Sequence, residues 1–198
     1  MDRHLLIFMH PKQDSFNGAI LNKVKETLLE ADKQVYTRNV TELSLNPSLT
    51  IQEYEDTLQG IYKEEIKEEF SYWEWADHIT FIFPVWWGSF PALAKGYLDR
   101  VIAYGLAYEL ENEEPIGKLE GKTGHAIFTT GAPVDKFQAE GLTDSINMIL
   151  QKAIFEFCGM KHELSLQLGY VVEASTQERT KMLNQVKAEV TKKLLSSC

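Results

Sequence analysis

The sequence has little cysteine, no excess of positive charge and no long hydrophobic run. Its only cysteines are Cys158 and Cys198, which provide neither a disulfide framework nor a metal-ligand cluster, so we expect a reducing, cytoplasmic setting and no metal site. The formal net charge of -9 argues against nucleic acid or an anionic membrane as the main partner, because both require a basic face. No apolar stretch approaches membrane-spanning length, which predicts that the chain does not insert into membranes.

Two nucleotide-binding motifs are also missing. The sequence contains no G-x-G-x-x-G turn, which disfavours a nicotinamide-binding Rossmann domain. It contains no G-x-x-x-x-G-K-[ST] loop either, which disfavours a nucleotide triphosphatase. The composition is otherwise that of a globular protein, with 44% hydrophobic and 25% charged residues. The length suits one large domain over residues 1–198.

Short apolar segments alternate with helical patterns along the chain. We predict strands at residues 3–10, 34–39, 78–85, 123–130 and 163–168. We predict helices at residues 15–31, 50–77, 91–103, 142–157 and 175–195, and a solvated acidic loop at 109–115. Strict alternation implies right-handed crossovers and a parallel sheet between two layers of helices. The predicted fold is α/β, a flavodoxin-like doubly wound five-stranded parallel sheet of order 2-1-3-4-5, with its ligand site at the carboxyl ends of the strands.

The loop after the first predicted strand suits an anion. It contains His10 and runs through Ser15, Phe16 and Asn17 into a helix, where unpaired backbone N–H groups lie beside hydroxyl and amide side chains. The alternative is that Asp14 or Ser15 only caps the helix.

The loop after the third predicted strand contains two adjacent tryptophans, Trp86 and Trp87. Pro84 and Pro91 bound this loop. Indole rings are large and rarely fully buried, so the pair indicates the wall of a pocket. The alternative is that the tryptophans only fill the core.

Small and hydroxyl residues follow the fourth predicted strand. Thr129, Thr130 and Gly131 allow a ligand to approach the backbone and can hydrogen-bond the rim of a heterocycle, although an ordinary turn explains the same residues. Because the three loops should meet at one edge of the sheet, together they favour a flat, phosphorylated aromatic ligand, namely a flavin nucleotide.

These motifs resemble those of the flavodoxin-like NAD(P)H:quinone oxidoreductases of the DT-diaphorase type, including their shorter bacterial members. The match includes the segments at residues 83–88, 91–96 and 99–101. The resemblance implies a flavin, FAD with FMN as the alternative, and NAD(P)H as co-substrate for ping-pong two-electron reduction of quinones or similar electrophilic aromatics. The implied cofactor contacts are His10, Ser15, Phe16, Asn17, Pro84, Val85, Trp86, Trp87, Thr129, Thr130, Gly131 and Ala132. The implied substrate cavity comprises Trp87, Gly88, Tyr108, Phe137 and Thr143.

The resemblance also implies a homodimer with active sites at the subunit interface, where Tyr108 lines the cavity of the partner subunit. We expect the helix with Lys95, Gly96 and Arg100 to serve this interface. Exposed-prone aromatic residues point to the same region, namely Trp87, Phe90, Tyr97, Tyr104 and Tyr108.

The sequence departs from the family pattern at Phe137 and Thr143. Family members have a tyrosine and a histidine there that assist hydride transfer, whereas neither residue here exchanges a proton near neutral pH. Hydride transfer itself needs only the nicotinamide held against the flavin, so activity is retained in principle. The alternative function is a flavin-binding regulatory subunit of a transporter or other protein, a role that the resemblance also implies because some small members of the family have it. His78 and His125 are interpreted as structural histidines.

Overall fold

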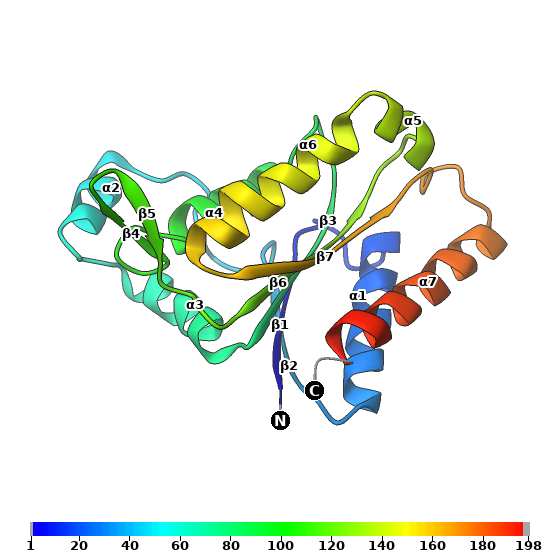
Figure 1. The fold of residues 1–198 in the computed structure, drawn as a ribbon, viewed down its shortest axis with the longest axis horizontal. Coiled ribbons are helices and arrows are strands. Elements are labelled where there is room, and N and C mark those ends of the chain that lie inside the picture. Colours follow the sequence, from blue (N-terminus) through cyan, green and yellow to red (C-terminus); the bar gives the residue numbers. More distant parts are fainter. Residues whose placement is uncertain (1, 196–198) are drawn as a thin grey trace.

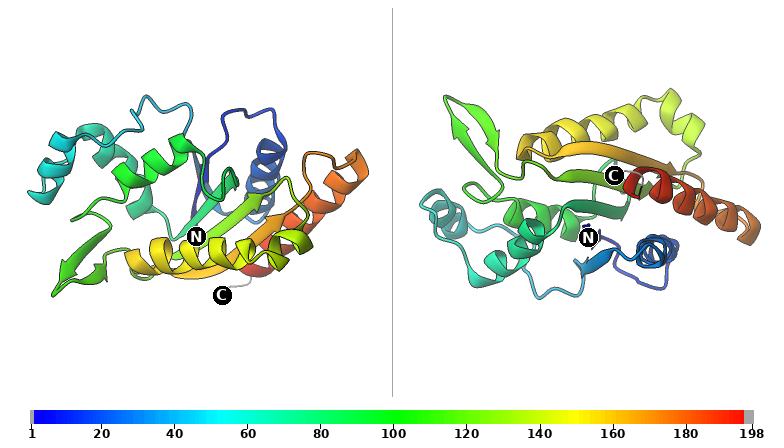
Figure 2. Two further views of the ribbon diagram at one scale, coloured as in Figure 1. Left: turned by 90° about the horizontal axis from the view of Figure 1, so that it is seen from above. Right: turned by 60° about the horizontal axis from the view of Figure 1, so that its bottom comes forward.

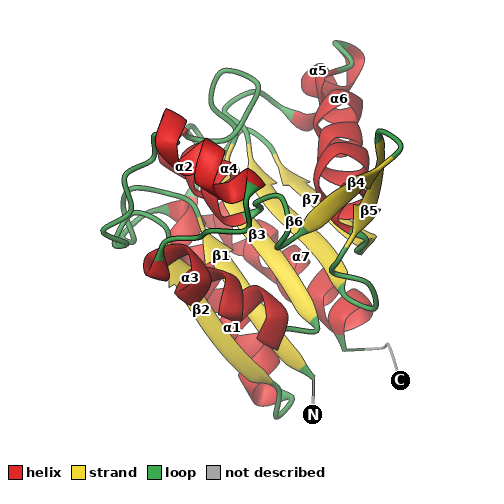
Figure 3. Ribbon diagram, turned by 90° about the vertical axis from the view of Figure 1, so that its left-hand side faces the viewer, coloured by secondary structure: helices red, strands yellow, loops and turns green. Residues whose placement is uncertain are grey.

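A five-stranded parallel sheet forms the centre of the protein. The computed structural model describes residues 2–195. The strands are β1 (Arg3–Phe8), β2 (Gln34–Asn39), β3 (His78–Pro84), β6 (Thr123–Thr129) and β7 (Lys161–Leu168). Their order is β2-β1-β3-β6-β7, which confirms the predicted flavodoxin-like order, and Figure 3 shows the strands side by side.

Helices cover both faces of the sheet. Helices α1 (Phe16–Glu30) and α7 (Thr176–Leu194) lie side by side on one face, where residues such as Val24 and Val186 pack against Leu6 and Ile82 (Figure 1). The other face is covered by α3 (Glu64–Trp75), α4 (Ala92–Val101), α6 (Leu142–Met148) and the π-helical segment η1 (Ile149–Phe155). Burial on both faces explains why the inner strands are continuous apolar runs rather than alternating ones.

The predicted helix at residues 50–77 is two helices. Helix α2 (Ile51–Leu58) begins after Thr50, whose side chain accepts a hydrogen bond from the Glu53 N–H at 3.2 Å. Gly60 follows it with φ +75°, a backbone conformation that ends the helix before α3 begins. The sequence has an acidic, helical pattern both before and after Gly60, so this glycine is the local signal that separates the two helices.

The prediction of a solvated loop at residues 109–115 was wrong. Strands β4 (Tyr108–Glu111) and β5 (Glu114–Gly117) form an antiparallel hairpin, which extends away from the sheet in Figure 2. Its two turn residues, Asn112 and Glu113, have φ values of 53° and 68°, as in the two-residue turns that match the twist of a hairpin. A short helix, α5 (Val134–Ala139), was also not predicted.

Helix α4 directs several residues toward the interior, in a region that the sequence predicts to be a dimer surface. Arg100 is buried, and its guanidinium donates to Glu53 and Glu65 at 2.6 Å each. Tyr97 is also buried, and its hydroxyl accepts from the Trp73 indole N–H at 3.0 Å. A side chain at Gly96 would meet the carbonyl oxygen of Pro47 at 2.3 Å, so glycine allows this close packing. The prediction that Tyr97 contributes exposed surface was therefore wrong, and Gly96 and Arg100 belong to the inward face of the helix. No helix within residues 2–195 is long and apolar enough to cross a membrane.

Candidate functional site

A cleft of about 530 Å³ opens at the carboxyl ends of β1, β3 and β6. Its lining residues are His10, Phe16, Asn17, Pro84, Val85, Trp86, Trp87, Thr129, Thr130, Gly131, Val171 and Val172. The structure thus gathers in one cleft every predicted cofactor contact except Ser15 and Ala132. The position is the topological switch point between β1 and β3, where ligands bind in open parallel sheets.

Asn17 ties the first loop to the end of β6. Its side chain is buried, and its amide nitrogen donates to the Thr129 hydroxyl at 2.9 Å. The other end of the amide, Oδ1, is buried without a hydrogen-bond partner among the described residues. Buried polar atoms are nearly always paired, so this acceptor fits a donor from a bound molecule, such as a ribityl hydroxyl.

The loop before α1 folds closely over the first turn of that helix. The Ser15 hydroxyl caps α1 by accepting the Gly18 N–H at 3.2 Å, which is the capping alternative left open by the sequence. A side chain at Gly18 would meet the carbonyl oxygen of Gln13 at 1.7 Å, so only glycine permits this conformation. The loop therefore places a helix N-terminus beside the cleft, where an anion is favoured.

A tight turn displays the second tryptophan. Trp86 and Ser89 exchange backbone hydrogen bonds at 3.0 Å, and the two central residues, Trp87 and Gly88, have φ values of 52° and 72°. This is a type I′ turn, in which a residue other than glycine, asparagine or aspartate is strained. Trp87 is nevertheless fully exposed, whereas Trp86 contacts the His10 ring edge-on at 5.9 Å between centroids. Filling the core is therefore not the role of Trp87.

The loop after β6 is held by the loop after β7. Thr130 donates its hydroxyl to the Ala132 carbonyl at 2.9 Å, and the backbone N–H of Val171 donates to the Thr130 carbonyl at 3.3 Å. A side chain at Gly131 would have only Val172 near it, at 3.7 Å, so this backbone is open to the cleft. Val171 and Val172 were missed in the sequence, although they follow the carboxyl end of the last strand.

The predicted substrate residues lie outside the lining of this cleft, apart from Trp87. Thr143 is buried and donates to Gln167 at 2.7 Å, and Gln167 donates in turn to the Thr130 hydroxyl at 3.2 Å. Phe137 packs, partly buried, against the core, and Gly88 forms the turn beside the cleft. The Gln167 side chain therefore connects Thr143 to Thr130, which lines the cleft.

Tyr108 lies in a separate hollow of about 350 Å³. Phe90, Leu98, Ile149 and Phe157 also line this hollow. Burial raises the pKa of the Tyr108 hydroxyl, which therefore stays neutral and able to donate a hydrogen bond. Tyr108 is thus not part of the cleft of its own subunit.

A doubly wound parallel sheet with an aromatic, amide-lined cleft at its switch point defines a flavodoxin-like nucleotide-binding protein. The family described as "Flavodoxin-like fold" matches residues 2–193. An "Uncharacterized NAD(P)H oxidoreductase" of Haemophilus influenzae is 39% identical, covering 80% of this chain and 79% of its own. The rat "Ribosyldihydronicotinamide dehydrogenase [quinone]" is 29% identical, covering 90% and 86%.

A solved structure has the same fold. The structure of Smu.1420 from Streptococcus mutans has a TM-score of 0.83 at 29% identity, covering 94% of this chain and 97% of its own. The chain therefore belongs to the flavodoxin-like family of NAD(P)H quinone oxidoreductases.

Proposed function

We propose that the protein is a flavin-dependent NAD(P)H oxidoreductase that reduces quinones or similar electrophilic aromatics, with one flavin in the cleft of each subunit. The observation that carries the proposal is the buried, unpartnered Oδ1 of Asn17 at the switch-point cleft. The names of the relatives, "Uncharacterized NAD(P)H oxidoreductase" and "Ribosyldihydronicotinamide dehydrogenase [quinone]", support the same reaction class. Nothing supports the regulatory alternative.

The residues of the cleft suit the parts of a flavin nucleotide. A bound flavin supplies two-electron chemistry between a nicotinamide and a quinone. Asn17 and the start of α1 would bind the ribityl and phosphate groups, and the open backbone at Gly131 would bind the polar edge of the ring. The exposed indole of Trp87 offers a flat surface for an aromatic substrate. Phe137 and Thr143 exchange no proton near neutral pH, so protonation relies on solvent or on other groups.

The cofactor and the activity can be tested on the purified protein. We expect a yellow protein, and chromatography of the released flavin distinguishes FAD, which the resemblance favours, from FMN. Turnover of NADH or NADPH with a quinone should give parallel double-reciprocal plots, because one face serves both substrates in turn. A colourless protein that binds no added flavin would contradict the proposal. Intersecting plots would overturn only the shared-face mechanism.

The proposal includes an obligate homodimer in which Tyr108 reaches the cleft of the partner subunit. The support is apolar surface around the hollow beside Tyr108, where Ile149 is 48% exposed and the adjacent Met148 is 64% exposed. We expect light scattering at micromolar concentration to give about twice the chain mass of 22.7 kDa. A mass of one chain would contradict the dimer.

A cytoplasmic location also belongs to this proposal. Cys158 is a free, buried thiol, and burial raises its pKa to about 12. Such a thiol is unreactive and suits a reducing compartment. Fractionation of cells that produce the protein tests the location.

A further inference from the structure

The loop that follows β6 is held from both faces of the sheet. On the α1 face, the Asn17 amide donates to the Thr129 hydroxyl at 2.9 Å. On the opposite face, the Nε2 of Gln167 donates to the Thr130 hydroxyl at 3.2 Å. Both threonines are buried. Gln167 was not predicted as a site residue, because it lies 37 positions from Thr130 and only the pairing of β6 with β7 brings the two together.

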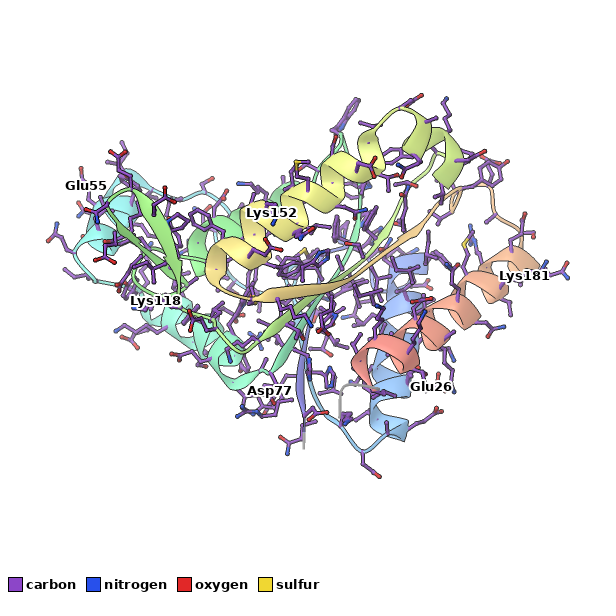
Figure 4. The ribbon with its side chains drawn as sticks, viewed as in Figure 1. Glu26, Glu55, Asp77, Lys118, Lys152 and Lys181 are labelled. Atoms are coloured by element: carbon purple, nitrogen blue, oxygen red, sulfur yellow. The ribbon has the colours of Figure 1, made fainter. Side chains whose placement is uncertain are left out.

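Strand alternation points Gln167 toward helix α6. The leucines on either side of it in β7 pack in the core beneath α1 and α7, so the Gln167 side chain faces the other way. There its Oε1 accepts a hydrogen bond from the Thr143 hydroxyl of α6 at 2.7 Å. Figure 4 shows the two helical layers on opposite sides of the sheet, with Lys152 labelled on the continuation of α6 and Glu26 on α1. Gln167 therefore joins the α6 layer to the loop after β6.

A chain of hydrogen bonds fixes the orientation of this amide. The Thr130 hydroxyl carries one proton, which it donates to the Ala132 carbonyl at 2.9 Å. It can therefore only accept from Gln167, which turns the amide nitrogen toward Thr130 and the amide oxygen toward Thr143. Each hydrogen bond has one direction, so the chain of bonds holds the loop in a single arrangement.

That arrangement leaves a backbone donor at the cleft. The Ala132 carbonyl also accepts the Tyr170 N–H at 3.1 Å, so the backbone is fixed on both sides of Gly131. Gly131 lines the cleft, and its N–H has no hydrogen-bond partner among the described residues. This N–H is free to donate to an acceptor on a bound molecule.

We propose that Gln167 is a positioning residue, which holds the loop at residues 130–132 so that the Gly131 N–H donates to the polar edge of the flavin ring. This role rests on the proposed flavin site, whose lining does not include Gln167. Hydrogen bonds to charged acceptors are the stronger ones, and the ring gains negative charge on reduction. A donor at this edge therefore stabilises the reduced ring more than the oxidised ring, and Gln167 contributes to both flavin affinity and reduction potential.

Thr143 acts on the loop through Gln167. Its hydroxyl bonds to the Gln167 amide, and Thr143 is not part of the cleft lining. Without this bond, Gln167 can still donate to Thr130, but its amide group is no longer fixed in rotation. Loss of the Thr143 hydroxyl should therefore have a smaller effect than loss of the Gln167 amide.

The reduction potential of the bound flavin separates a positioning role from a purely structural one. Gln167→Met keeps the length of the side chain and removes both hydrogen bonds. Fluorescence titration of the apoprotein with FAD and with FMN should show about tenfold weaker binding in this variant. The reduced flavin should lose about tenfold more affinity than the oxidised flavin. Equilibration with a reference dye should therefore give a potential lower by about 30 mV for a two-electron couple.

A second variant and a matched control accompany this measurement. Thr143→Val should shift affinity and potential in the same direction by a smaller amount. Adding Thr143→Val to Gln167→Met should change neither quantity further, because Thr143 acts through Gln167. The control is Gln151→Met, since Gln151 is a partly buried glutamine in η1 that donates to Glu156 at 2.6 Å. This control should leave flavin affinity and potential unchanged.

The outcomes distinguish this role from the proposed function. Wild-type affinity and potential in Gln167→Met would overturn the positioning role and leave the proposed function intact. A lower Tm with an unchanged potential would also overturn it, because that result indicates a structural role only. If Gln167→Met does not fold, an unchanged potential in Thr143→Val is the result that overturns it. A wild-type protein that binds no flavin would contradict the proposed function, and this role with it.

Discussion

The two edges of the sheet are built from the same strands but differ in openness and in charge preference. The carboxyl edge is an open cleft with a fully exposed indole, and the helices that follow each strand begin there. The amino edge is closed by ion pairs and by Lys122, which donates to the carbonyls of Glu74 and Ala76 at 2.7 and 2.6 Å. Helix N-termini favour anions and helix C-termini favour cations. Because each helix begins at the carboxyl edge and ends at the amino edge, the carboxyl edge favours negative charge and the amino edge favours positive charge.

The largest expected effect follows from removing the polar contacts of the carboxyl edge. Replacing Ser15 and Asn17 together by alanine should weaken flavin binding by more than about 100-fold, because the ribityl group loses the buried amide of Asn17 and the helix start that would bind the phosphate loses its Ser15 cap. Flavin retention after dialysis, or fluorescence titration of the apoprotein, measures this change. His78→Gln, a polar change at the amino edge, is the control and should leave flavin affinity unchanged. Equal affinity in the double variant would show that the assignment to phosphate and ribityl groups is wrong.

A smaller effect is expected from restoring proton-exchanging residues next to the cleft. The variant Phe137→Tyr, Thr143→His should change the turnover rate and add an ionisation near pH 6.5 to its pH profile, the ordinary value for histidine. Steady-state rates from pH 5 to 9 provide the measurement.

This substitution also removes the hydrogen bond from Thr143 to Gln167, so a second variant is needed. Thr143→Val removes the same bond without adding a titrating group, and it should change the rate without a new ionisation. An unchanged profile in the double variant would show that these positions do not affect the chemistry.

The smallest expected effect concerns the strained turn that displays Trp87. Because asparagine tolerates a positive φ, Trp87→Asn should raise the free energy of unfolding by about 1 kcal/mol and the Tm by about 2–4 °C. It should also lower quinone turnover, because the aromatic surface is lost. Gly88→Ala is the matched control and should lower the Tm. Its φ is 72°, which strains an alanine, and no atom crowds the added methyl group. An unchanged Tm for Trp87→Asn would contradict the strain.

The parts predicted correctly are those with a local signal. Buried apolar runs marked the three inner strands, and short, partly apolar segments marked the two edge strands β2 and β7. Their alternation with helices was sufficient to predict the order of the sheet. The hairpin was missed because its strands are short, polar and exposed, so no hydrophobic period marks them. Tyr97 and Arg100 were misplaced because a polar or aromatic side chain in a helix does not reveal whether a distant partner buries it.

By itself, the sequence determined the alternation of strands and helices and the three loops that line the cleft, because periodicity and turn chemistry act over a few residues. Only the tertiary structure decided which distant side chains meet. The pairing of His4 with His78, the bond from Asn17 to Thr129 and the contact of Val171 with Thr130 all depend on sheet register. Register is set by the packing of both faces of the sheet at once, and no short segment of the chain contains that information.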